Sequence, residues 1–218
     1  IAYAILSTTD YGTGDEVIYP NPGFPIYESQ ILANGAKPVP IHLHEARDFA
    51  FDPAELERLI TAKTKLLILN YPHNPTGGLL SRKDLEAIAA ILRKHPQVWV
   101  YADEIYSRLC YTGDFFSIAQ LPGMLERTII SDGASKTWAM TGWRIGFAAG
   151  PRDVITAMAN IQSQSTSNPA SISQKAAVEA LHGPQEFIAT MNAEFDRRRK
   201  YMVERLNGMP GVSCLMPV

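Results

Sequence analysis

The stretch that indicates the class of fold is Val98-Trp99-Val100-Tyr101-Ala102-Asp103. The segment Val98–Ala102 is apolar or aromatic without interruption, which is typical of a strand buried on both faces of a sheet. Similar short segments recur along the first 150 residues and alternate with helical patterns. The other predicted strands are Glu16–Tyr19, Pro38–Ile41, Lys65–Leu69, Thr128–Ser131 and Ile145–Ala149. This alternation predicts an α/β fold with a mostly parallel sheet flanked by helices.

Capping residues mark two of the predicted helices. Asp52-Pro53 places an N-cap residue directly before a proline at the first helical position. Ser81 is followed three residues later by Asp84, a variant of the capping box. Apolar residues then recur at helical spacing on one face, at Leu85, Ile88, Ala89 and Leu92.

The pattern changes after Pro151. We expect no strand between Pro151 and Gly208, and one long helix over residues 184–206. We therefore expect residues 1–183 to form a large domain and residues 184–218 to begin a second, truncated one. The chain opens without Met inside an apolar segment and stops in what resembles the entry to a strand. We expect it to be an interior piece of a longer protein.

Composition excludes several classes of partner. The 218 residues carry a formal net charge of −2, which gives no reason to expect a nucleic acid or a membrane surface as partner. No apolar run approaches the roughly 20 residues that cross a bilayer. The basic run Arg197–Lys200 is isolated and is interpreted as a solvated helix face or a subunit contact. Cys110 and Cys214 form no motif, and we expect two buried thiols in a reducing cytosol.

Two polar clusters follow predicted strands, where open α/β sheets place their ligands. The loop Asn70–Gly78 contains two prolines and two glycines, which would aim Asn74 at a set position. A plain turn is the simpler interpretation of this loop. Asp103 ends the strand quoted above and needs a cationic partner if it is buried. A protonated pyridine ring would be such a partner, with Tyr106 beside it, although Asp103 could also be a helix N-cap.

Two further clusters carry basic residues. Lys136 lies in Ser131–Thr137, where burial and neighbouring cations would favour a neutral amine that attacks an aldehyde. Ser135 and the backbone N–H groups of a following helix would suit a phosphate. Arg144, in Thr141–Gly146, offers the planar fork that binds a phosphate dianion. Each cation alone would more often be a surface charge. Together the four clusters supply a hydroxyl partner, a ring-nitrogen partner, a covalent anchor and a phosphate clamp.

The sequence resembles class I aminotransferases of pyridoxal-phosphate (PLP) fold type I, in the aspartate-aminotransferase-like branch. The resemblance covers essentially the whole chain in collinear order. The matching segments are Gly14–Pro20, Asn74–Gly77, Asp103–Tyr106, Ser135-Lys136, Met140–Gly146 and Ser163–Pro169.

The resemblance implies a role for each matching residue. Lys136 would form a Schiff base with the PLP aldehyde and later move a proton at the substrate Cα. Asp103 would pair with the pyridine nitrogen, and Asn74 and Tyr106 would hydrogen-bond the ring hydroxyl oxygen. Ser135 and Arg144 would hold the phosphate. Phe24, in Pro20–Phe24, matches an aromatic residue that stacks on the ring, or is an ordinary core aromatic.

The resemblance also implies the reaction: transfer of an amino group between an L-amino acid and a 2-oxo acid, in a cytoplasmic homodimer. Ser163–Pro169 would then reach toward the neighbouring site. Gly133 replaces a phosphate-binding serine of some relatives. The glycine/serine phosphate loop would precede Ile1 and the arginine for the substrate α-carboxylate would follow Val218, so we expect this piece alone not to transaminate.

Several alternatives stay open. A PLP-dependent lyase would use the same lysine, aspartate and arginine, and a catalytically silent PLP-fold module is a third possibility. A P-loop is suggested by Ser135–Thr137 but lacks the required glycines. His42 and His44 share a strand face without a third metal ligand, so we expect no metal site.

Overall fold

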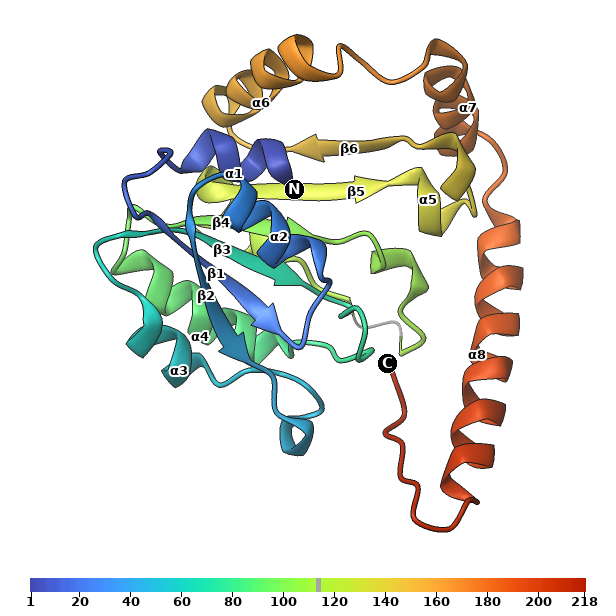
Figure 1. The fold of residues 1–218 in the computed structure, drawn as a ribbon. Helices are drawn as coiled ribbons and strands as arrows, with labels where there is room; N and C mark the ends of the chain where they lie inside the picture. Colours follow the sequence, from blue (N-terminus) through green and yellow to red (C-terminus); the bar gives the residue numbers. More distant parts are fainter. Residues whose placement is uncertain (113–114) are drawn as a thin grey trace.

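The computed structural model describes residues 1–112 and 115–218 (Figure 1). Within these residues, six strands form one sheet in the order β2-β1-β3-β4-β5-β6. Neighbouring strands are parallel except β5 and β6, which are antiparallel. The strands are β1 Glu16–Asn21, β2 Lys37–His42, β3 Thr64–Asn70, β4 Trp99–Asp103, β5 Thr128–Gly133 and β6 Gly146–Ala149. The predicted α/β fold with a mostly parallel sheet is confirmed.

Helices cover both faces of the sheet and continue beyond it (Figure 1). The α-helices are α1 Ala2–Thr8, α2 Ile26–Ala33, α3 Pro53–Leu59, α4 Arg82–Arg93, α5 Ala134–Thr137, α6 Arg152–Ser165, α7 Ser171–His182 and α8 Glu186–Asn207. The short 3-10 helices are Glu45–Arg47, Ser107–Leu109, Ile118–Gln120, Leu125–Arg127 and Thr141–Trp143.

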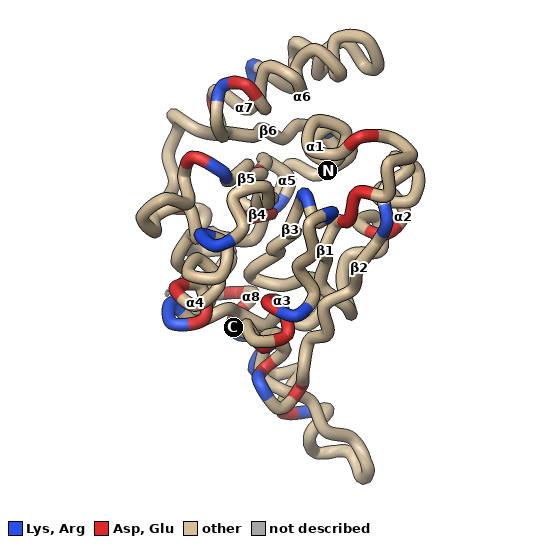
Figure 2. Tube along the Cα trace, turned by 90° about the vertical axis from the view of Figure 1, so that its left-hand side faces the viewer, with Lys and Arg blue, Asp and Glu red and all other residues tan. Residues whose placement is uncertain are grey.

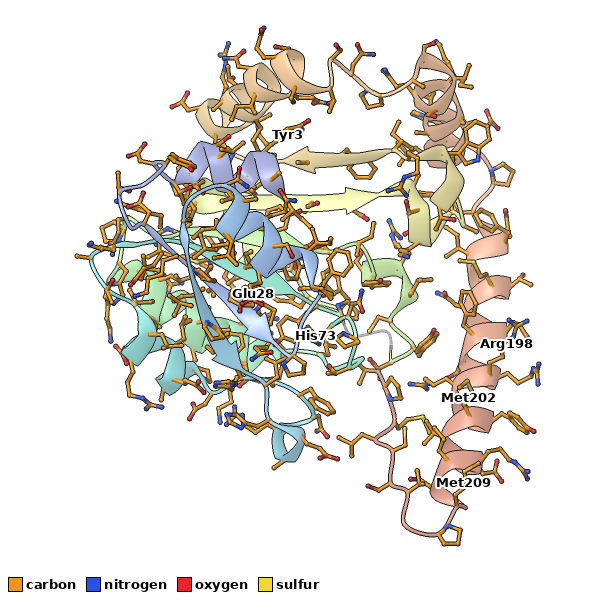
Figure 3. All side chains as sticks on the ribbon, in the orientation of Figure 1. Tyr3, Glu28, His73, Arg198, Met202 and Met209 are labelled. Atoms are coloured by element: carbon orange, nitrogen blue, oxygen red, sulfur yellow. The ribbon has the colours of Figure 1, made fainter. Side chains whose placement is uncertain are left out.

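Alternating side chains of the central strands supply two separate cores. Leu67 and Leu69 of β3 join the cluster under α3 and α4, whereas Leu66 and Ile68 join the cluster under α1, α2 and α6. Because successive side chains of a strand point to opposite faces, an unbroken apolar run is what a doubly covered sheet requires. Figure 3 labels Tyr3, whose hydroxyl contacts Ser165 at 3.0 Å and so joins α1 to the end of α6.

The predicted helix starts are confirmed in detail. The Asp52 carboxylate accepts a 2.9 Å hydrogen bond from the Ala54 N–H at the start of α3. At α4, Ser81 Oγ accepts from the Asp84 N–H, and the Asp84 carboxylate accepts from the Ser81 N–H. Both bonds satisfy backbone donors that the first turn of a helix leaves without partners.

Strand ends differ from the predicted ones by one or two residues. β4 continues through Asp103 because this residue pairs with Ser131 of β5. β5 continues through Gly133, which pairs with Gly146 of β6. Backbone pairing with a neighbouring strand therefore extends each element past its apolar run, which hydrophobicity alone does not reveal.

The segment after β6 is helical, as predicted. α8 begins two residues after the expected start, and in Figure 1 it stands beside the sheet before the chain turns back. Its basic run forms ion pairs with acids one turn earlier, Arg197 and Arg198 with Glu194, and Arg199 and Lys200 with Asp196. Figure 2 shows acidic and basic residues interspersed on this helix, and Arg197, Arg198 and Lys200 are exposed as expected of a solvated face. Arg199 differs, because its side chain is only 13% exposed and its guanidinium lies over the Tyr111 ring.

The cysteines differ from expectation. Cys110 and Cys214 are free thiols, but both are partly exposed rather than buried. Cys110 lies in an irregular segment after β4 and Cys214 lies in the tail beyond α8, and irregular segments run over the surface. Across the described residues, none of the helices combines the length and the apolar character needed to span a membrane.

Candidate functional site

A cavity of about 450 Å³ lies at the carboxyl ends of β3, β4 and β5. Parallel strands bring these ends to one edge of the sheet, which is where open α/β sheets bind ligands. The structure brings all seven predicted site residues to the lining of this cavity: Phe24, Asn74, Asp103, Tyr106, Ser135, Lys136 and Arg144. Their roles toward a cofactor stay predictions.

Asp103 is the last residue of β4 and is only 9% exposed. Burial raises the pKa of its carboxyl above the ordinary aspartate value, while hydrogen bonds from the Tyr27 hydroxyl and the Ile105 N–H oppose that rise. The Tyr27 hydroxyl donates to Oδ2 at 2.8 Å. Among the described residues, no lysine or arginine forms an ion pair with this carboxylate. The cavity therefore presents a buried acid that a bound cation would stabilise.

Asn74 is held by its own loop and by Tyr106. Its backbone N–H donates to Asn70 Oδ1 at 3.0 Å, and its side-chain Nδ2 donates to the Tyr106 hydroxyl at 3.3 Å. Gly77 has a φ of +71°, which a residue with a side chain rarely adopts, and its N–H donates to the His73 carbonyl. The loop thus presents an amide and a phenol side by side at the cavity. The segment Asn70–Gly78 is more than a plain turn.

His73, labelled in Figure 3, stays inside this loop. Its Nδ1 contacts Thr76 Oγ1 at 2.8 Å, and burial lowers its pKa to about 4. The imidazole is therefore neutral at physiological pH and holds the loop together rather than reacting.

Lys136 and Ser135 lie on α5, a short helix directly after β5. The Lys136 Nζ lies 5.7 Å from the centroid of the Tyr106 ring, within the range in which an ammonium group interacts with an aromatic face. Lys136 therefore shares the cavity wall with the phenol that contacts Asn74. The amine and the amide-phenol pair therefore line one cavity from neighbouring positions.

Arg144 has an unusual backbone. Its φ of 52° and ψ of 47° place it in the left-handed region, which is uncommon for a residue with a side chain. The guanidinium donates to the Thr141 carbonyl at 2.9 Å and lines the cavity. Such a conformation persists where the surroundings determine it, and it is frequent at ligand sites.

Phe24 lies both in the cavity wall and against the apolar core. Its ring lines the cavity and also meets the Tyr27 ring edge to face, at a centroid distance of 5.7 Å and an angle of 82°. It packs as well against the core under α1 and α2. The two interpretations of Phe24, a core aromatic and an aromatic residue of the site, are therefore compatible.

Contacts around residue 133 explain why this position suits a glycine. A Cβ at this position would lie 3.1 Å from Gly146 Cα and 3.2 Å from the Ile145 carbonyl oxygen. The close pairing of β5 with β6 therefore leaves little room for a side chain at this position.

The structure adds lining residues that the sequence did not single out: Tyr27, Asn70, Tyr101, Ser131 and Thr141. Asn70 links two clusters, since its Nδ2 donates to the Asp103 carbonyl at 3.1 Å while its Oδ1 holds Asn74. Its position at the end of a predicted strand was a usable signal. Tyr27 gave no signal, because its contact with Asp103 spans 76 residues.

The competing sites lack comparable geometry. His44 contacts Glu55 at 3.4 Å, and the described residues contain no group of three or more His, Cys, Asp or Glu that could hold a metal ion. Thr137, which a P-loop would direct to a metal, is fully buried and does not line the cavity.

Comparisons with known proteins identify the family of the chain. A profile of the family described as "Aminotransferase class I and II" matches residues 1–218. The aspartate/prephenate aminotransferase of Cereibacter sphaeroides is 48% identical over 94% of this chain and 52% of its own length. The aspartate aminotransferase of Geobacillus stearothermophilus is 42% identical over 94% of this chain and 52% of its own. The chain spans about half the length of these curated relatives.

Solved structures are similar over nearly the whole chain. The aspartate aminotransferase of Rhizobium meliloti has a TM-score of 0.95 at 42% identity and covers 99% of this chain and 54% of its own. The aromatic aminotransferase of Pyrococcus horikoshii has a TM-score of 0.93 at 39% identity, over 99% and 58%. Sequence and fold agree along the same residues, and the chain belongs to the class I and II aminotransferase family.

Proposed function

We propose that the cavity binds PLP and that the protein transfers an amino group between an L-amino acid and a 2-oxo acid. The observation that carries the proposal is the convergence of Asn74, Asp103, Lys136 and Arg144 on one cavity, from four separate segments. The names of the relatives, aspartate and aspartate/prephenate aminotransferases, support the transferase reaction.

The residues fit the cofactor. The buried carboxylate of Asp103, without an ion-pair partner among the described side chains, suits a cationic ring nitrogen. Asn74 and Tyr106 would hold the ring hydroxyl oxygen, and Phe24 would lie against the ring. Ser135 and Arg144 would hold the phosphate, where the guanidinium offers paired charge-assisted hydrogen bonds.

When bound, PLP supplies an aldehyde for covalent attachment and a ring that accepts electrons. Lys136 is the proposed covalent anchor, because its primary amine is the nucleophile of the cavity wall. Once released, the same amine would move a proton at the substrate Cα. Asp103 would keep the ring cationic, and Asn74 and Tyr106 would fix its orientation.

A transamination assay tests the reaction. The full-length protein would receive an amino-acid donor and 2-oxoglutarate, and the keto acid formed from the donor and the glutamate formed from the acceptor would both be measured. We expect one glutamate for each keto acid formed. Keto acid formed without consumption of the acceptor would instead indicate a PLP-dependent lyase, and no turnover despite cofactor binding would indicate a catalytically silent module.

The organisation of the protein is proposed along the same lines. Residues 1–183 would form the large cofactor-binding domain, and residues 184–218, with α8, would begin the smaller one. We further propose, by analogy with the family, a cytoplasmic homodimer in which Ser163–Pro169 is directed toward the neighbouring site. Sedimentation of the full-length protein and mixing of two inactive variants with separate lesions would test the shared site.

A further inference from the structure

One buried hydrogen bond at the cavity has no part in the proposed set of contacts. Tyr27 lies in the first turn of α2, is 1% exposed, and donates its hydroxyl to Asp103 Oδ2 at 2.8 Å. Its ring also meets Phe24 edge to face. A single side chain therefore joins the acid at the end of β4 to the aromatic wall of the cavity.

The direction of this hydrogen bond is fixed. Burial and the neighbouring Asp103 charge raise the pKa of Tyr27 far above the ordinary tyrosine value. The hydroxyl thus keeps its proton at every physiological pH, and a carboxylate can only accept. Asp103 also accepts from the Ile105 N–H. The Tyr27 hydroxyl on α2 and the Ile105 N–H in the turn after β4 together hold the carboxylate and favour its charged form.

Other titratable groups near the Asp103 carboxylate come from several elements. They are Tyr101, Glu104 and Tyr106 on and after β4, Asp132 on β5 and Lys136 on α5. Glu104 and Asp132 are acids whose own pKa values are raised by burial and by Asp103. Burial is what raises the pKa of the Asp103 carboxyl, and the hydrogen bond from the Tyr27 hydroxyl is the largest contribution that opposes this rise.

We propose that Tyr27 is a positioning residue that keeps Asp103 ionised and aimed at the cavity. The hydrogen bond from Tyr27 offsets part of the cost of burying the carboxylate, and contact with Phe24 fixes the phenol. Its consequence for the cofactor depends on the proposed function, whereas its effect on Asp103 does not.

The Asp103 carboxyl can be titrated directly. Cofactor-free full-length protein would be labelled with ¹³C at aspartate carboxyls, and the Asp103 signal would be assigned by its loss in Asp103→Asn. In Tyr27→Phe we expect the midpoint of this signal to rise by about one to two pH units, the effect of removing one hydrogen bond to a charged group. The same midpoint in the folded variant and the wild type would overturn the proposal.

Tyr71 offers a matched control. It is a buried tyrosine whose hydroxyl has no hydrogen-bond partner among the described residues, and it does not line the cavity. Tyr71→Phe removes the same atom and should leave the Asp103 midpoint in place. If Tyr27→Phe does not fold, fluorotyrosine in the wild-type chain replaces it, since fluorination makes the phenol a stronger donor. The midpoint must then fall, and an unchanged midpoint would contradict the proposal.

The cofactor readout separates the two proposals. As the pH is lowered, Tyr27→Phe should lose its affinity for PLP at a higher pH than the wild type does. In an Asp103→Asn background, replacing Tyr27 should not change the pH at which affinity is lost. If the protein binds no PLP, the proposed function fails while the carboxyl titration still decides the role of Tyr27. If PLP binds but neither the Asp103 midpoint nor the PLP affinity profile moves in Tyr27→Phe, only the inference about Tyr27 fails.

Discussion

The apolar cluster under α4 and the cavity at the carboxyl ends of β3–β5 share the same strands and differ in what they bury. Under α4, Leu85, Ile88 and Leu92 belong to the same buried hydrophobic cluster as Leu67 and Val100. At the cavity the strands end in Asn70 and Asp103, and burial raises the pKa of the acid. One region lowers the free energy of the fold, and the other holds a charge whose burial costs free energy.

This difference indicates that separate sets of residues stabilise the fold and form the candidate site. A core can be filled by any side chains of suitable size and polarity, but a cavity that binds a charged ligand needs groups that the fold alone would not choose. Substitutions in the two regions should therefore have separate signatures. Core variants should unfold more easily, whereas cavity variants should stay folded and lose binding or turnover.

The largest effect is expected at the proposed anchor. Lys136→Ala should lower transaminase activity by at least about 10²–10⁴-fold, the range that a positioned acid-base group alone supplies, without loss of the fold. Activity per mole of full-length protein measures it. Lys83→Ala, an exposed lysine on α4, is the control and should keep activity. Nearly normal turnover in Lys136→Ala would exclude the anchor assignment.

The core variant should show the opposite signature. Leu92→Ala removes a fully buried side chain and should lower the free energy of unfolding by about 2–5 kcal/mol. Denaturant unfolding measures this change, and activity of the folded fraction should be retained. Leu125 is 57% exposed, so Leu125→Ala should change stability by less than about 0.5 kcal/mol. Equal losses in both variants would contradict the assignment of the core.

A smaller effect is expected at the start of α4. Ser81→Ala removes the capping box and should lower the free energy of unfolding by about 1 kcal/mol. Ser81→Thr keeps the hydroxyl acceptor and should recover most of that stability. Indistinguishable unfolding curves for Ser81→Ala and the wild type would show that the cap contributes nothing measurable.

The smallest effect concerns stability without the cofactor. Burial raises the pKa of Asp103 in the folded protein above its value in the unfolded chain. At pH values above the folded-state pKa, the ionised carboxylate therefore lowers the stability of the fold. This penalty is lost as the pH falls through the folded-state pKa and the carboxyl becomes protonated. Asp103→Asn should therefore raise the melting temperature of the cofactor-free protein at pH 8, with a difference that shrinks toward acidic pH. A variant less stable than the wild type at pH 8 would reverse the sign assigned to this burial.

The sequence was informative wherever a single segment determines its own structure. The apolar runs of β3 and β4 and the caps Asp52 and Ser81 are local signals, and each predicted element was found. The strand ends were less accurate, because Asp103 and Gly133 belong to strands only through pairing with the next strand. The exposed positions of Cys110 and Cys214 follow from the path of irregular segments, which periodicity does not describe.

The candidate site divides in the same way. Asn74, Asp103, Lys136 and Arg144 could be selected because each follows a strand or lies in a motif. Tyr27 could not be selected, because its side chain reaches Asp103 only after α2 folds onto the sheet. The left-handed backbone of Arg144 is likewise a property of the folded chain.

Trapping the cofactor on the protein tests the central claim most directly. The full-length protein with PLP would be treated with borohydride, digested, and searched for the peptide that carries the reduced cofactor. We predict label on the peptide that contains Lys136, and loss of both this label and the visible absorption band in Lys136→Ala. Label on another lysine, or a band that persists unchanged in the variant, would contradict the account.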